Sequence, residues 1–393
     1  MRTRCLRVPV AAGAALTALT VLTGLTVLTG CGSGGGQPSD VIAVSTNQCG
    51  GTWSVPGPGL HTLQIDNQGT EGGEIDLVDP ANGAIYAEIE GSGPGTVNPI
   101  TIDFGSGNYA LVCQFSDVNP MQGATVTVAG HVTGTPAVLP VTYNDLRPAA
   151  KTYQAQEETA LKVLARETAT LDAAVRAGNL AQARRDWLTA HLQYETLGDA
   201  YGAFGDFDTE IDGRADATGV SSPQWTGFFR LEYGLWHGQS LPSLAGVADT
   251  LNKDTDELVT WWQTQQVPLA DLGRRAHEVI ENALEFQLTG HDDYGSDTTL
   301  AATAAAVTAS RVLLALLHPL LAPRDPGLPA VYAGLSQLQS LLDKEQLPNG
   351  WWVPVSALPD AARQAIDAAC GQLLQELGVV AAITEPRSTV HDF

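Results

Sequence analysis

The segment WTGFFRLEYGLWHG, residues 225–238, decides the fold of the C-terminal half of this 393-residue chain. Its aromatic and apolar residues surround a single acid, Glu232, three residues after Phe229, so a helix places both side chains on one face. An unpaired carboxylate among aromatic rings is costly, and we expect Glu232 to hold a bound cation or a partner such as Arg230. The segment therefore predicts a buried helix that carries a functional acid.

A second group of polar residues precedes this segment. His191 and Glu195 are four residues apart, which sets them on one helix face, and Asp206 and Asp208 follow in a glycine-bearing loop. Helical bundles bind iron and similar ions where carboxylates and imidazoles converge, and three or more hard ligands favour Fe(III), Mn, Ca or Zn over Cu(I). We expect a metal site formed by His191, Glu195, Asp206, Asp208 and Glu232. The alternatives are a solvated helix acid, an exposed or hydrogen-bonded histidine, and aspartates that serve turns and helix caps.

The whole C-terminal part has helical spacing. From about residue 143 onward Ala, Leu, Glu and Gln dominate, and apolar residues recur with a helical period. Breaks rich in Gly or Pro fall at residues 178–179, 202–219, 238–244, 290–296, 323–329 and 348–359. The pattern predicts seven or eight helices, packed as one large bundle or two, in an all-α domain of residues 146–393.

Residues 41–135 have a different composition, dense in Gly, Pro, Thr and Val. Short runs of alternating or β-branched residues occupy residues 41–44, 60–65, 98–102, 109–113 and 124–128. Such runs with frequent turn signals are typical of a small β-sandwich. A proline-bearing linker, residues 136–145, joins it to the helical part, and the predicted fold class is multidomain, β followed by α.

The N-terminus has the pattern of a bacterial export signal. Arg2, Arg4 and Arg7 precede an uncharged apolar run over residues 8–29, which ends in the sequence LTGC at residues 28–31. This ending resembles a lipobox, in which the cysteine, here Cys31, takes the lipid. The apolar run alone would also suit a transmembrane helix. Because a glycine-rich tether follows, over residues 31–40, we expect a signal peptide of residues 1–30 and a lipid-anchored protein outside the cytoplasmic membrane.

Three cysteines remain after this signal. In an oxidising compartment Cys49 and Cys113 are expected either to form a disulfide or to offer two thiolates to a metal, and the sequence leaves both open. Cys370 lies in a helical run and is expected to be a small buried residue.

The charge balance is strongly acidic. The chain has 43 Asp and Glu against 20 Lys and Arg, a formal net charge of −23. This surface repels nucleic acid and suits a protein that concentrates cations, although acidity also keeps an exported protein soluble.

The helical segments together resemble the imelysin-like (peptidase M75-like) domain, in the branch of the EfeO-type iron-uptake proteins. The resemblance rests on residues 187–195, 203–208, 211–214 and 225–238, and it continues to the long C-terminal helices. The family has Gly-Phe-His-x-x-Glu where this chain has Phe229 in the histidine position. The resemblance thus implies a site that lacks one imidazole and leans toward carboxylates, with His191 better placed to compensate than His237.

The β region resembles a cupredoxin domain, and more closely the N-terminal domain of the same proteins. That resemblance implies iron or copper ligands at Cys49, Glu74, Glu88, Glu90 and Cys113, with Met121 as a soft extra ligand. A blue-copper centre needs two histidines and a cysteine, and His61 is the only histidine before residue 131, so we do not expect blue-copper electron transfer.

The expected function is that of a metal-binding protein. The family implies a lipid-anchored component of an iron-uptake system that hands iron to a membrane iron permease, with a haem peroxidase as companion. A metallopeptidase would need an open metal position and a general base, and the chain has no His-Glu-x-x-His helix. A third possibility is a degenerate scaffold that binds a polysaccharide or a protein partner without metal.

Overall fold

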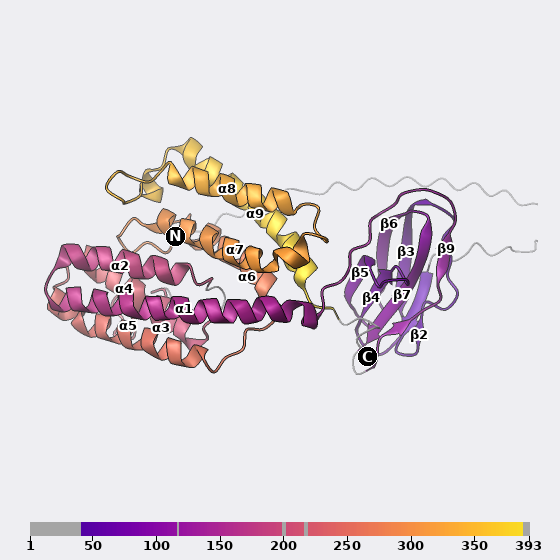
Figure 1. The fold of residues 1–393 in the computed structure, drawn as a ribbon, viewed down its shortest axis with the longest axis horizontal. Helices are drawn as coiled ribbons and strands as arrows, with labels where there is room; N and C mark the ends of the chain where they lie inside the picture. Colours follow the sequence, from indigo (N-terminus) through magenta and orange to yellow (C-terminus); the bar gives the residue numbers. More distant parts are fainter. Residues whose placement is uncertain (1–40, 116–117, 199–201, 216–218, 388–393) are drawn as a thin grey trace, which may run out of the picture. The chain divides into compact units, whose positions relative to one another are not determined.

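The computed structural model describes residues 41–115, 118–198, 202–215 and 219–387. The predicted signal peptide, tether and lipid-bearing Cys31 lie outside these residues. Figure 1 shows strands in the N-terminal part of the chain and helices in the C-terminal part. The order of strands before helices, predicted from composition and spacing, is confirmed.

The N-terminal region contains two β-sheets. One has the strand order β2-β1-β3-β6, and the other has the order β5-β4-β7-β8, with β9 paired to β7. β1 runs parallel to β3, and the other pairs are antiparallel. The strands are β1 (Val41–Ser45), β2 (Gln48–Cys49), β3 (Gly59–Asn67), β4 (Gly73–Val78), β5 (Ile85–Ser92), β6 (Val97–Phe104), β7 (Gly107–Phe115), β8 (Met121–Gln122) and β9 (Val126–Val128).

Alternation along these strands builds the core. Side chains of a strand point to opposite faces in turn, so Leu63 and Ile65 of β3 share the buried side with Ile100 and Ile102 of β6, where Leu63 is paired with Ile100. A disulfide joins Cys49 to Cys113 within the same apolar cluster, across 64 residues of sequence. The two cysteines therefore belong to the interior of the β region.

The C-terminal region has nine α-helices within the described residues, where the spacing predicted seven or eight. They are α1 (Tyr143–Arg176), α2 (Leu180–Glu195), α3 (Asp206–Asp212), α4 (Gly227–Trp236), α5 (Leu241–Trp262), α6 (Asp271–Asn282), α7 (Thr299–Leu321), α8 (Leu328–Asp343) and α9 (Asp360–Thr384). One helix that the spacing did not predict is α3, which has seven residues and lies within the glycine-containing break predicted at residues 202–219.

Each helix buries an apolar face. α1 packs against α2 and α5, α6 packs against α7 and α9, and α8 and α9 lie side by side (Figure 1). α1 begins at a capping box, in which Thr142 accepts from the Asp145 N–H and the Asp145 carboxylate accepts from Thr142. α7 and α9 are long and apolar enough to span a membrane by length and composition, and the apolar window of α7 is 67% buried inside the helical region.

Between α6 and α7 the chain passes through a π-helix over Ala283–Gln287. Single π-helical turns widen a helix locally and often accompany functional sites. This turn ends at Gln287, whose side chain reaches the polar group described next.

Candidate metal centre

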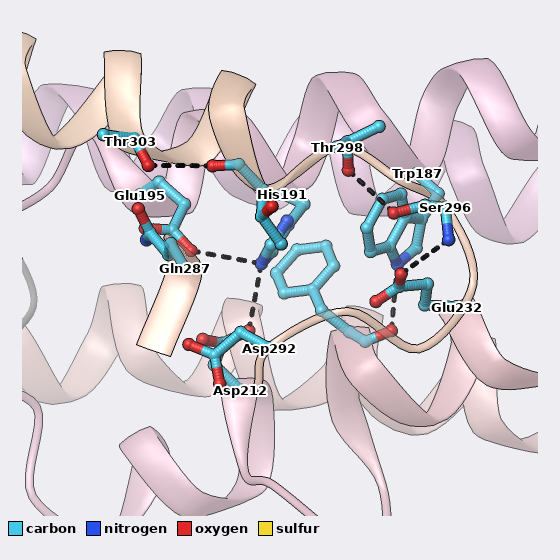
Figure 2. Close-up of polar contacts among 12 residues, drawn as sticks. Trp187, His191, Glu195, Asp212, Glu232, Gln287, Asp292, Ser296, Thr298 and Thr303 are labelled. Atoms are coloured by element: carbon cyan, nitrogen blue, oxygen red, sulfur yellow. Dashed lines mark hydrogen bonds and ion pairs between the residues drawn. The ribbon is translucent and has the colours of Figure 1, made fainter. Parts of the chain in front are cut away.

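Three side chains from two helices converge in the helical region. His191 and Glu195 come from α2, and Asp212 ends α3. The His191 Nε2 atom lies 3.3 Å from Glu195 Oε1 and 3.2 Å from Asp212 Oδ1, and one ligand atom of each residue lies within 4.8 Å of the others. Figure 2 shows the imidazole pointing toward both carboxylates. The arrangement offers one nitrogen and two carboxylate oxygens to a single ion.

A glycine permits this meeting of helices. Gly227 begins α4 at φ +83°, and a Cβ atom there would lie 2.2 Å from the backbone carbonyl oxygen of Ile211. Only glycine allows that approach at this backbone conformation. Gly227 therefore holds the start of α4 against the end of α3, next to Asp212.

Aromatic rings enclose His191, which is 4% exposed. Trp187 stacks on the imidazole with ring centroids 4.8 Å apart, and Phe229 meets it edge-on at 5.4 Å. Within the part of the chain that the structure describes, neither ring nitrogen has a partner in hydrogen-bond geometry. A buried imidazole without hydrogen bonds is costly, which fits a group that awaits a ligand.

Gln287, at the end of the π-helix, orients one of the acids. Its Nε2 donates to Glu195 Oε2 at 2.8 Å, which leaves Glu195 Oε1 facing His191. Gln287 is 3% exposed. Such hydrogen bonds to a metal-ligating carboxylate fix its direction.

Glu232 is placed differently from the sequence-based expectation. It is fully buried on α4, and its Oε1 accepts from the backbone N–H of Tyr294 at 3.0 Å and of Ser296 at 2.9 Å. Burial raises the pKa of Glu232 to about 8, opposed by the hydrogen bonds from Ser296 and by His191. Figure 2 shows Glu232 beside Ser296, away from Glu195. Its oxygens do not belong to the group formed by His191, Glu195 and Asp212.

The two loop aspartates are also apart from this group. Asp206 begins α3 and is exposed, and the Asp208 carboxylate accepts from the Phe204 N–H at 3.1 Å. The last residue of the same short helix, Asp212, is the one that reaches His191.

The β region holds a second group of acids. Glu74, Asp76 and Glu88 offer oxygens within 4.8 Å of one another, and Glu90 lies nearby on β5. Burial raises the pKa of Asp76 to about 8, and the charges of Glu74 and Glu88 add to this rise. Arg387, which follows α9, donates to Glu88 and Glu90.

The structure corrects the thiolate alternative for Cys49 and Cys113, because the two sulfurs are bonded to each other. Cys113 is paired with Ile75 in the ladder and shares its core face, whereas Glu74 and Asp76 lie on the opposite face of β4. Met121 pairs with Cys113 and packs against the same apolar cluster. The cysteines therefore cannot join the acids in one site.

Several members of these groups were missed by reasoning from sequence. Asp212, Asp76, Gln287 and Arg387 were not predicted as members of either site. Period-two spacing from Glu74 would have pointed to Asp76, since both then share one face of a strand. Gln287 and Arg387 carry no local signal, because their roles depend on contacts distant in sequence.

Comparison with known proteins identifies the family of the chain. The family model for imelysin (peptidase M75) matches residues 149–380, more than half of the chain. A protein of Yersinia pestis named iron uptake system component EfeO is 28% identical over 348 residues, covering 86% of this chain and 88% of the relative. A protein of the same name from Escherichia coli O157:H7 is 25% identical over 343 residues, covering 86% and 90%. By its family match, the chain belongs to the imelysin family, and over most of its length it is similar to EfeO iron-uptake components.

Proposed function

We propose that this protein binds iron in an iron-uptake system, with His191, Glu195 and Asp212 as the ligands of the helical region. The observation that carries the proposal is the buried imidazole of His191, which faces two carboxylates and has no partner in hydrogen-bond geometry among the described residues. The name of the relatives supports iron as the cargo.

The donor set suits such a cargo. Two carboxylates and one imidazole offer charge −2 and hard or borderline atoms, which favours Fe(II) or Fe(III) over Cu(I). Gln287 holds Glu195 in place for this task. Phe229, in contact with the His191 ring, forms an apolar wall at the position where the family resemblance implies an imidazole.

For the β region we propose a cupredoxin-like fold and a second cation site. Two sheets around one core and a parallel β1–β3 pair support the fold. The site comprises Glu74, Asp76 and Glu88, and its oxygens suit iron, with Cu(II) as the other candidate.

We propose that the protein acts outside the cytoplasmic membrane, held by a lipid on Cys31. The N-terminal sequence supports this location. In this role it would deliver iron to a membrane permease, with a haem peroxidase as companion. Binding and delivering iron do not require the chain to be an enzyme.

A metal-free scaffold for a polysaccharide or a protein is the second candidate. The packing of Phe229 favours it, because this ring completes an apolar cluster with Trp225 and Ala215 and meets the Tyr294 ring at 5.2 Å. Such a cluster needs no ion.

Iron binding by matched variants separates the two candidates. We would dialyse the metal-free full chain against ferric citrate and measure bound iron, using a Glu88→Gln background that silences the β region. The variant Glu195→Gln with Asp212→Asn should lose about 100-fold in affinity, because both charged ligands are gone. Asp206→Asn is the control for the Asp212→Asn substitution, since it also replaces an aspartate of α3 by asparagine. It should keep full iron binding. Equal binding by the double variant and this control would refute the helical site.

A further inference from the structure

Four acids share the outer face at one edge of the β region. Glu74 and Asp76 lie on β4, Glu88 and Glu90 lie on β5, and Asp76 is paired with Glu88 in the ladder. Side chains opposite each other in an antiparallel pair project to the same side. The strands thus bring negative charge together at one place.

A guanidinium from a distant part of the chain lies among these acids. Arg387 Nη2 is 2.7 Å from Glu88 Oε1, Nη1 is 2.8 Å from Glu90 Oε1, and Nε is 3.9 Å from Glu74 Oε1. The Arg387 side chain is 10% exposed. Its backbone N–H donates to the Val141 carbonyl at 2.8 Å, and Pro386 forms a β-bridge with Val141. The short segment after α9 therefore delivers a charge to the β region.

One guanidinium does not balance four carboxylates when all of them are ionised, and burial already raises the pKa of Asp76 to about 8. Asp76 is 9% exposed, and its Oδ1 has no hydrogen-bond partner among the described residues. The charge of Arg387 lowers the pKa of Asp76, but less than burial raises it. The buried oxygens of this group are thus only partly neutralised, and an ion of higher charge would stabilise them more than Arg387 does.

We propose that Arg387 is a tethered competitor of the metal ion: it occupies the carboxylates of Glu74 and Glu88 when no metal is bound, and a multivalent cation displaces it. This inference rests on the proposed cation site of the β region. A guanidinium remains protonated and offers no lone pair, so Arg387 cannot join the ligands of a metal. The same carboxylate oxygens therefore contact either Arg387 or the metal ion, not both.

Displacement has a structural consequence. When Arg387 leaves, the segment after α9 loses its side-chain contacts with β4 and β5 and keeps its backbone contacts with Val141. Linkage is reciprocal: if metal binding weakens the attachment of this segment by some factor, then attachment of the segment weakens metal binding by the same factor. Metal loading of the β region is thereby coupled to release of the chain's C-terminal segment.

The test compares cation affinity with and without this arginine. The full chain would carry His191→Ala and Glu195→Gln to silence the helical region, and would be titrated with Tb³⁺, a trivalent ion that prefers oxygen ligands. Arg387→Gln should bind Tb³⁺ about tenfold more tightly. Arg324→Gln is the matched control: Arg324 donates to the carbonyls of Leu139 and Pro140 in the same linker and does not belong to the acid group.

Each outcome decides the proposal. Equal Tb³⁺ affinity of the Arg387→Gln variant and its parent would overturn the competition while leaving the metal site standing. Failure of either protein to bind Tb³⁺ would overturn both, and Glu88→Gln should reproduce that failure. Saturating Tb³⁺ should also speed tryptic cleavage after Arg387, read by mass spectrometry as release of residues 388–393. An unchanged cleavage rate would overturn the release of the segment.

Discussion

The acid group of the helical region and the acid group of the β region differ in the basic side chain that lies beside their carboxylates. In the helical region the partner is His191, and in the β region it is Arg387. A histidine can give up a proton and become a ligand, whereas an arginine stays charged and has to move away. Under the two proposals, similar carboxylate groups serve different tasks: the first includes its own nitrogen ligand, and the second must exchange its occupant.

The regions also differ in covalent support, which allows them to be separated. The variant Cys49→Ala with Cys113→Ala removes a link across 64 residues, and loop-closure entropy puts the loss at about 4 kcal/mol of stability for the β region. Hydrogen exchange should show the loss over residues 41–128 and leave the helices protected. Cys370→Ala, which removes a thiol from the helical core, is the control. Equal destabilisation of both regions by the double variant would show that they unfold as one unit and that the two sites cannot be treated separately.

Phe229→His sharpens the difference between the two groups further. The phenyl ring of Phe229 touches the His191 imidazole, so a histidine at this position adds a second nitrogen beside the group. We expect iron affinity of the helical region to rise about tenfold, or about 1.4 kcal/mol. Stability should fall, because Phe229 is 1% exposed and packs against other aromatic rings.

Phe229→Leu is the control for this substitution, since it changes the packing without adding a nitrogen. Ferric citrate competition would measure all three proteins. If Phe229→His and Phe229→Leu bind iron equally, position 229 does not contribute to the site.

The sequence predicted the helical and β regions because periodicity reports which faces are buried. It also predicted the His191–Glu195 pair, whose contact is set by one turn of helix. Asp212 comes near that pair next to the place where Gly227 lets α4 approach Ile211, a tertiary contact that no local pattern encodes. The proposed union of Cys113 with Glu74 failed for a different reason, since the register places them on opposite faces of one sheet.

Substitution of Glu232 tests whether this acid of the aromatic segment 225–238 stabilises the fold or binds the metal. Because burial raises the pKa of Glu232 from 4.5 to about 8, the folded chain keeps a proton that the unfolded chain releases between these values. The associated stability is complete below about pH 4.5 and is lost as the pH rises toward 8. Glu232→Gln removes this titration and should flatten the fall in helix stability by up to about 1 kcal/mol per pH unit.

The same variant should keep iron affinity within about threefold, since the Gln carbonyl oxygen can still accept the N–H groups of Tyr294 and Ser296. Urea unfolding followed by helical circular dichroism at pH 5 to 8 would measure the slope. Asp76→Asn is the control, because the pKa of Asp76 is also raised to about 8 but its titration belongs to the β region. A loss of more than tenfold in iron affinity would return Glu232 to the ligand set, and the helical group would then resemble the all-carboxylate group of the β region more closely.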